Sequence, residues 1–201
     1  MTEENPTNDY KWQPTRQNLR NIEENAFLLR KLAGLTPTDK LDSIRLSKKF
    51  NIEVVFPDQI SSLPLEQKEQ LARLDAKVWS GISNELPDGK LLIILNPNQT
   101  PERANVTVME EIAHVHYGHQ PSQLGGLGQR QYDERAEQEA YQTAAAALLP
   151  SKVVAQAIWS GESVKSLAKK YGASIELTEM RIKLLNLWGP YQNNLKSERV
   201  N

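Results

Sequence analysis

Apolar residues recur every three or four positions in several stretches of this chain, a spacing typical of helices that bury one face. The first stretch starts at Arg16 and ends at Gly34, so we predict an amphipathic helix between them. Its apolar positions are Leu19, Ile22, Ala26, Leu29 and Leu32. A second helix should follow a cap at Thr38 or Asp39. Its apolar positions are Leu41, Ile44, Leu46 and Phe50.

Three short apolar runs predict strands, because they are too short for helices and are bounded by residues that favour turns. These runs are residues 52–56, 76–81 and 91–95. Pro57 ends the first run, and Pro87-Asp88-Gly89 supplies a turn between the other two. The polar residues 58–76 are expected to form a loop or a helix.

Two longer helices are predicted in the second half of the chain. Thr100 is a natural N-cap, followed by proline at the first helical position, for a helix that runs to about Gly118. A flexible connection, residues 119–131, contains three glycines and a proline. It leads into a helix from about Tyr132 to Leu149, which a proline terminates.

The C-terminal part is predicted to be helical as well. Ser163 to Leu185 has the pattern of two short helices broken at Gly172-Ala173-Ser174. The ends of the chain, residues 1–14 and 191–201, are polar, and we expect disordered tails there. Residues 15–150 are then expected to form the main domain, with 151–190 as a helical extension of it.

Composition and charge exclude several classes of protein. With 201 residues the chain can bury one substantial core, so a second full domain is not expected. A net charge of −1 favours neither nucleic acid nor an acidic membrane surface. The absence of cysteine excludes disulfides and thiolate zinc sites, so any metal must use nitrogen and oxygen ligands. No stretch has the length and apolarity of a membrane span, and we expect a cytoplasmic protein without membrane contact.

All three histidines lie in one short stretch, directly after two adjacent acids. Glu110 and His114 are four residues apart on the predicted helix, so their side chains share one face and can converge on one ion. His116 lies about 200° from His114 around the helix, and we interpret it as a core histidine. His119, near the helix end, is expected to be a cap or a hydrogen-bond donor to a metal ligand. In a strand, His114 and His116 would instead share a face, but the N-cap favours the helix.

A third ligand has to come from another element. On the helix that follows, Glu139 lies on a face of small residues that lets another helix approach closely. It is our first candidate for this ligand. Glu137 lies on the side of Tyr141 and Leu148 and is the runner-up. An exposed acidic turn with no chemical role is the alternative for both.

At these residues the sequence resembles the ImmA/IrrE family of zincin-like metallopeptidases, over about residues 16–185. Asn96, Arg103 and the run Thr107-Val108-Met109-Glu110-Glu111-Ile112-Ala113-His114 are similar to the family's strand, arginine and "TLAHELGH" helix. Gly118-His119 stands where a Gly-His pair often follows, and residues 139–150 are similar to the family's "EAxxFAxxLLMP" segment. The resemblance implies an α+β, minimal zincin-like fold. In it, a small mixed sheet packs on an active-site helix and a glutamate helix, with a C-terminal helical hairpin.

The resemblance also implies a metal site and a reaction. Glu110, His114 and Glu139 would be the metal ligands and Glu111 the general base. Zn²⁺ is the expected ion, with Mn²⁺ or another divalent cation as the alternative. The family is associated with the cleavage of helix-turn-helix repressors in phage induction and radiation response. We therefore expect a metal-dependent endopeptidase that acts on a repressor or another regulatory protein.

The sequence departs from the family at the first ligand, where Glu110 replaces the first histidine of His-Glu-x-x-His. Two carboxylates cancel the charge of a divalent ion, so the Lewis acidity of the ion should fall. Harder oxygen ligands also tolerate manganese, iron or magnesium better. A degenerate peptidase fold that serves as a sensor or protein-binding module is therefore the alternative. DNA binding by the helix pair at 163–185 is a second alternative, which the net charge does not support.

Overall fold

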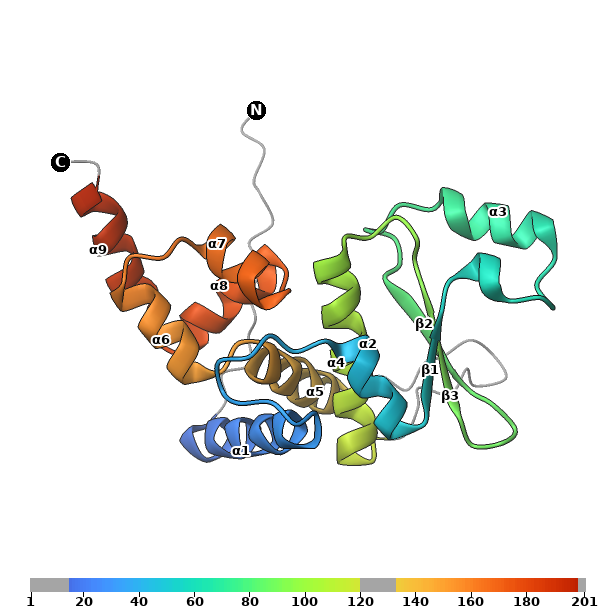
Figure 1. Cartoon of the computed structure of the whole chain (residues 1–201), viewed down its shortest axis with the longest axis horizontal. Helices are drawn as coiled ribbons and strands as arrows, with labels where there is room; N and C mark the ends of the chain where they lie inside the picture. Colours follow the sequence, from blue (N-terminus) through green and yellow to red (C-terminus); the bar gives the residue numbers. More distant parts are fainter. Residues whose placement is uncertain (1–14, 120–132, 199–201) are drawn as a thin grey trace.

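The computed structural model describes residues 15–119 and 133–198 (Figure 1). It has an α+β architecture, as predicted. A three-stranded sheet with α3 lies at one end, α1, α4 and α5 pack together in the middle, and α6 to α9 form the other end. The helices are α1 Arg16–Leu32, α2 Ser43–Ser47, α3 Leu65–Arg73, α4 Pro101–Tyr117, α5 Glu134–Leu148, α6 Ser151–Trp159, α7 Val164–Tyr171, α8 Ile175–Leu184 and α9 Trp188–Glu198. Two short 3₁₀ turns are η1 Lys48–Phe50 and η2 Pro57–Gln59.

The predicted mixed sheet is confirmed, with β1 Ile52–Val55, β2 Gly81–Glu85 and β3 Leu91–Leu95 in the order β1-β3-β2. Strand β1 is parallel to β3, and β2 is antiparallel to it. The strand predicted at 76–81 is wrong, because β2 begins only at Gly81. Leu86 N–H donates to the Lys90 carbonyl and closes a tight turn, which fixes the register of β2 against β3. Only the five residues before that turn then pair with β3.

Helix α4 begins and ends where its predicted capping residues place it, and α5 runs from Glu134 to Leu148, close to the predicted range of about Tyr132 to Leu149. Thr100 accepts a hydrogen bond from Arg103 N–H at 3.2 Å at the start of α4, and Gly118 ends the helix with a left-handed φ of 69°. Helix α2 differs from the prediction, because its N-cap is Asp42. Asp39 instead accepts a hydrogen bond from Thr36 N–H, which closes the preceding turn.

The core forms where the inner face of the sheet and helices α1, α4 and α5 meet. Ile93 and Leu95 of β3 are fully buried, as are Val108 and Ile112 of α4. A run of buried alanines on α5, Ala144 to Ala147, lets α1 and α4 approach it closely. Helix α4 therefore buries one face in this core. Val115, which lies at the margin of that face, is 38% exposed.

The C-terminal elements are the predicted helix pair, α6 within the predicted helical extension, and α9, which extends beyond it. Helices α7 and α8 are separated by Gly172, which has a φ of 66°, and Ser174 caps α8. Helix α9 extends to Glu198, where the sequence analysis expects a disordered tail from 191. It is tied down by Asn194, whose amide donates to the Ile158 carbonyl at 2.6 Å. The tail predicted at 1–14, most of the connection predicted at 119–131, and residues 199–201 lie outside the described residues.

No helix within residues 15–119 and 133–198 combines the length and apolarity needed to cross a membrane.

Candidate metal centre

The candidate site lies where the last two turns of α4 meet the first two turns of α5, two helices in extensive contact. Glu110 and His114, four residues apart on α4, lie on one face, as predicted. Glu137 of α5 completes a group whose potential ligand atoms all lie within 4.8 Å of one another. All three residues are partly buried. Two helices thus bring two carboxylates and an imidazole together.

The spacing within this group suits a divalent cation. His114 Nε2 lies 3.6 Å from Glu137 Oε2. Two ligands at about 2.0–2.2 Å from a tetrahedral zinc ion are about 3.4 Å apart, so this pair needs little adjustment. The upper bound of 4.8 Å means that the most distant pair would have to close by at most about 1.4 Å to reach this spacing, a change within reach of side-chain rotation. The residues present therefore fit a bound divalent ion.

The charges of the group also favour a cation. Burial and then the neighbouring charge of Glu111 raise the pKa of Glu110 to about 7. Burial opposes the charged form of His114, but the hydrogen bond and charge of Glu137, with the charges of Glu111 and Glu110, raise its pKa overall. Without a metal, the group therefore holds protons that a divalent ion would displace. Glu111 acts electrostatically on both Glu110 and His114, which places its charge beside the group.

His119 returns towards His114 because Gly118 ends α4 in a left-handed conformation. Gly118 N–H donates to the Val115 carbonyl and His119 N–H to the His114 carbonyl, the hydrogen bonds of a Schellman motif. The imidazole of His119 then lies with its Nδ1 3.0 Å from His114 Nδ1. Its Nε2 lies 3.4 Å from Glu139 Oε2. His119 thus contacts His114, and its predicted role as a hydrogen-bond donor to a metal ligand stays a prediction.

His116 points to the other side of α4, towards α1. Its Nε2 lies 2.8 Å from Asn25 Oδ1, and burial lowers the pKa of its imidazole. It is half-buried rather than fully in the core, because its polar edge meets an amide. Close by, the Tyr117 hydroxyl lies 2.8 Å from Thr143 Oγ1 and adds a second polar link between α4 and its neighbours.

The structure brings Glu137, and not Glu139, together with Glu110 and His114. From the sequence, Glu139 is the first candidate because small residues share its face. Small residues show how closely two helices can pack, but they do not show which carboxylate meets His114. The two acids lie about 200° apart on one helix, so their assignment depends on the rotation of α5 against α4. The ligand role of Glu139 stays a prediction, and the observed spacing favours Glu137.

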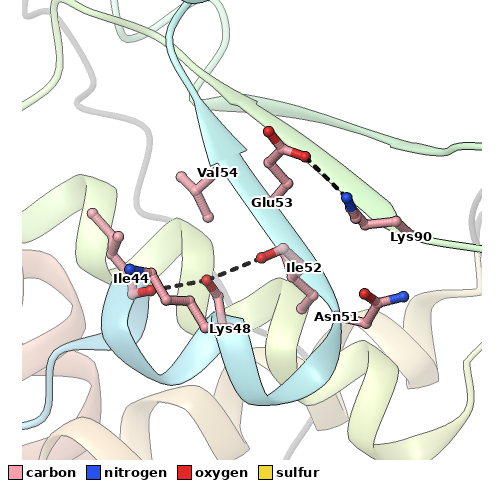
Figure 2. Close-up of a pocket in the computed structure, with 8 residues that line it drawn as sticks. Ile44, Lys48, Asn51, Ile52, Glu53, Val54 and Lys90 are labelled. Carbon is pink, nitrogen blue, oxygen red and sulfur yellow. Dashed lines mark hydrogen bonds and ion pairs between the residues drawn. The ribbon is translucent and has the colours of Figure 1, made fainter.

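A separate pocket of about 320 Å³ lies where α2 and η1 meet the edge strand β1 (Figure 2). Its lining includes Ile44, Lys48, Ile52, and an ion pair between Lys90 Nζ and Glu53 Oε2 at 3.5 Å. It contains no residue of the candidate metal centre, so the two sites are distinct.

These features define a zincin-like protein. A small mixed sheet packs on a helix that carries Glu-Glu-x-x-His, and the next helix adds a carboxylate. The chain belongs to a family of peptidases: a family model described as the IrrE N-terminal-like domain matches residues 48–183. This match confirms the resemblance to the ImmA/IrrE family. None of the curated proteins matches the chain.

One solved structure with a similar fold is a Mycobacterium tuberculosis transcriptional regulator. The two share 17% sequence identity with a TM-score of 0.52, and the match covers 83% of this chain. It covers 48% of the regulator, so this chain spans about half the length of that protein. At this identity the likeness shows a common fold alone.

Proposed function

We propose that this protein is a metal-dependent endopeptidase of the ImmA/IrrE type that cleaves a regulatory protein, such as a helix-turn-helix repressor. The observation that carries the proposal is the convergence of Glu110, His114 and Glu137, with Glu111 beside them. Membership of the peptidase family supports the same activity. The three converging residues would hold the ion, and Glu111 would act on the substrate.

When bound, a divalent cation supplies Lewis acidity, which activates water and polarises the scissile carbonyl. Glu111 would take a proton from the attacking water as the new carbon–oxygen bond forms. It would then give this proton to the leaving amine nitrogen as the carbon–nitrogen bond breaks. Water supplies the second oxygen of the new carboxylate, so no covalent enzyme intermediate is needed.

The ligand set predicts a weaker Lewis acid than a site with two histidines. Glu110 and Glu137 together carry a charge that cancels that of the ion, which reduces the polarisation of a carbonyl. Zn²⁺ is the expected ion, and Mn²⁺ is the alternative because carboxylate oxygens suit it. Replacement of Glu110 by histidine should raise zinc affinity, because imidazole nitrogen suits zinc, and should raise turnover, because the ion then keeps a net positive charge.

Metal analysis of the wild-type protein and three variants tests this proposal. The wild-type protein and Glu111→Gln should each hold about one ion per chain, because Glu111 is not among the grouped ligands. His114→Ala and Glu137→Ala should lose it. Each protein is then incubated with repressor proteins from its source organism, and fragments are identified by mass spectrometry. Cleavage by wild type that Glu111→Gln abolishes supports the proposal, whereas equal metal content in all four proteins refutes it.

The alternative is a peptidase fold that binds metal or protein without catalysis, which the replacement at position 110 favours. A protein that holds metal and binds a repressor, but leaves it intact at every metal tested, would support that alternative. DNA binding by α7 and α8 receives less support. The first turn of α8, the helix that would enter the groove, carries the exposed Glu176, whose charge opposes contact with phosphates.

A further inference from the structure

Helix α1 buries one face in the core and carries an exposed apolar pair on the opposite face. Ile22, Ala26 and Leu29 are buried where α1 packs on α5. Across the helix, Phe27 is 57% exposed and Leu28 is 47% exposed. At about 100° per residue, the midpoint of this pair lies about 180° from the centre of the buried positions. Since α1 also lies at an edge of the molecule (Figure 1), the pair is open to a partner.

Two opposite charges frame the apolar pair. Glu24 lies one turn before Leu28, and Lys31 lies one turn after Phe27, and both charged side chains are exposed. We call these four residues the outer face of α1. Glu24 and Lys31 are about 10 Å apart along the helix axis, too far to pair with each other. Neither of them forms an ion pair within residues 15–119 and 133–198.

The outer face is symmetric about the point midway between residues 27 and 28. A two-fold axis at this point, perpendicular to the helix, brings an antiparallel second copy of α1 against the first. Glu24 is then level with Lys31 of the second copy, and Lys31 is level with Glu24 of the second copy. A parallel copy would instead set like charges opposite each other, which is unfavourable. The charges of this face therefore complement those of a second copy in one orientation.

We propose that the outer face of α1 binds a second copy of this chain as an antiparallel helix pair, with Phe27 and Leu28 at the two-fold axis. Glu24 of each copy pairs with Lys31 of the other. The apolar centre supplies most of the affinity, and the charges select the orientation, because exposed ion pairs contribute little free energy.

This interface is separate from the candidate metal centre, because the outer face contains none of its residues. The proposal therefore does not depend on the proposed function. An interface made by one helix from each copy is at the small end of specific interfaces, so the expected dimer is reversible and of micromolar affinity.

Sedimentation velocity of the full chain, from about 1 µM to about 300 µM, measures the monomer–dimer equilibrium. Wild type should change from monomer to dimer over this range. Phe27→Ser should weaken the dimer about 30-fold or more, because the two-fold axis removes the central side chain twice. Trp159→Ser is the control, since it removes a 68% exposed aromatic side chain from α6. A wild-type chain that stays monomeric throughout, or equal dimer affinities in the two variants, would overturn the proposal.

Exchange of the charges tests the orientation. Glu24→Lys and Lys31→Glu should each weaken the dimer about 5–30-fold, because each change replaces both ion pairs by like charges. The double variant restores opposite charges and should recover the affinity of wild type. A mixture of the two single variants should associate more strongly than either alone. A double variant as weak as the single variants would rule out the antiparallel pair.

Cross-linking tests the identity of the occupant. The chain has no cysteine, so an introduced cysteine reports contact with a second copy directly. Leu28→Cys lies beside the two-fold axis and should form a disulfide-linked dimer on mild oxidation, because the two Cβ atoms face each other. Ser83→Cys, on exposed β2, should link much more slowly. Circular dichroism checks that the variants fold. Equal linking rates would show that a second copy does not occupy this face.

Discussion

The buried carboxyl group of Glu110 predicts a specific dependence of stability on pH in the metal-free protein. Its pKa rises from 4.5 to about 7 on folding, mainly because burial disfavours the charged form. Between these two values the folded state binds more protons than the unfolded state, so the free energy of unfolding falls as pH rises. The raised pKa of His114 acts in the same direction, because folding also favours its protonated form.

The magnitude follows from the size of the shift. Each unit corresponds to about 1.4 kcal/mol, so Glu110 contributes a loss of up to ~3 kcal/mol between about pH 4.5 and pH 7.5. This is an upper estimate, because the residue keeps some contact with solvent. Glu110→Gln cannot ionise and should remove most of this loss. The dependence of the free energy of unfolding on pH that remains in this variant should come from His114.

Urea unfolding of chelator-treated protein, followed by circular dichroism from about pH 5 to pH 8, measures this effect. Glu69→Gln is the matched control, because it removes a carboxylate from an exposed ion pair on α3. It should leave the pH dependence unchanged. Excess Zn²⁺ should restore stability most at high pH, since the ion replaces the displaced protons. If wild type and Glu110→Gln lose stability in parallel as pH rises, the burial argument is refuted.

Three further predictions concern the helices around the site. Glu111→Gln should retain metal, measured by elemental analysis, but lower the rate of substrate cleavage by about 10²–10⁴-fold; an unchanged rate excludes it as the base. Arg181→Met should lower the free energy of unfolding, measured in urea, by about 3–5 kcal/mol. The reason is that the fully buried guanidinium pairs with Glu23 and donates to the Leu149 carbonyl at the C-terminal end of α5. The exposed Arg73→Met should cost under about 1 kcal/mol in the same experiment, and equal losses would contradict the reasoning. Gly118→Ala should cost about 1–2 kcal/mol and weaken metal binding, because alanine strains the left-handed turn that places His119; unchanged binding would argue against this link.

Local signals in the sequence predicted the elements that carry the site. The cap at Thr100 and the glycine at 118 fix both ends of α4, and the spacing of Glu110 and His114 places them on one face. These features depend on contacts between residues a few positions apart, which the sequence records directly. The peptidase family could be recognised for the same reason, because its metal-binding motif lies within one helix.

The sequence alone determined this protein's α+β class, its main helices and the two residues of the candidate metal centre that lie on α4. The tertiary structure decided the rest, because the remaining features depend on contacts between distant segments. The rotation of α5 against α4 selected Glu137 over Glu139 as the neighbour of His114. The turn before β3 set the bounds of β2, and long-range contacts of polar residues held α9 in place. A periodic pattern shows which residues share a face, but only packing decides what that face meets.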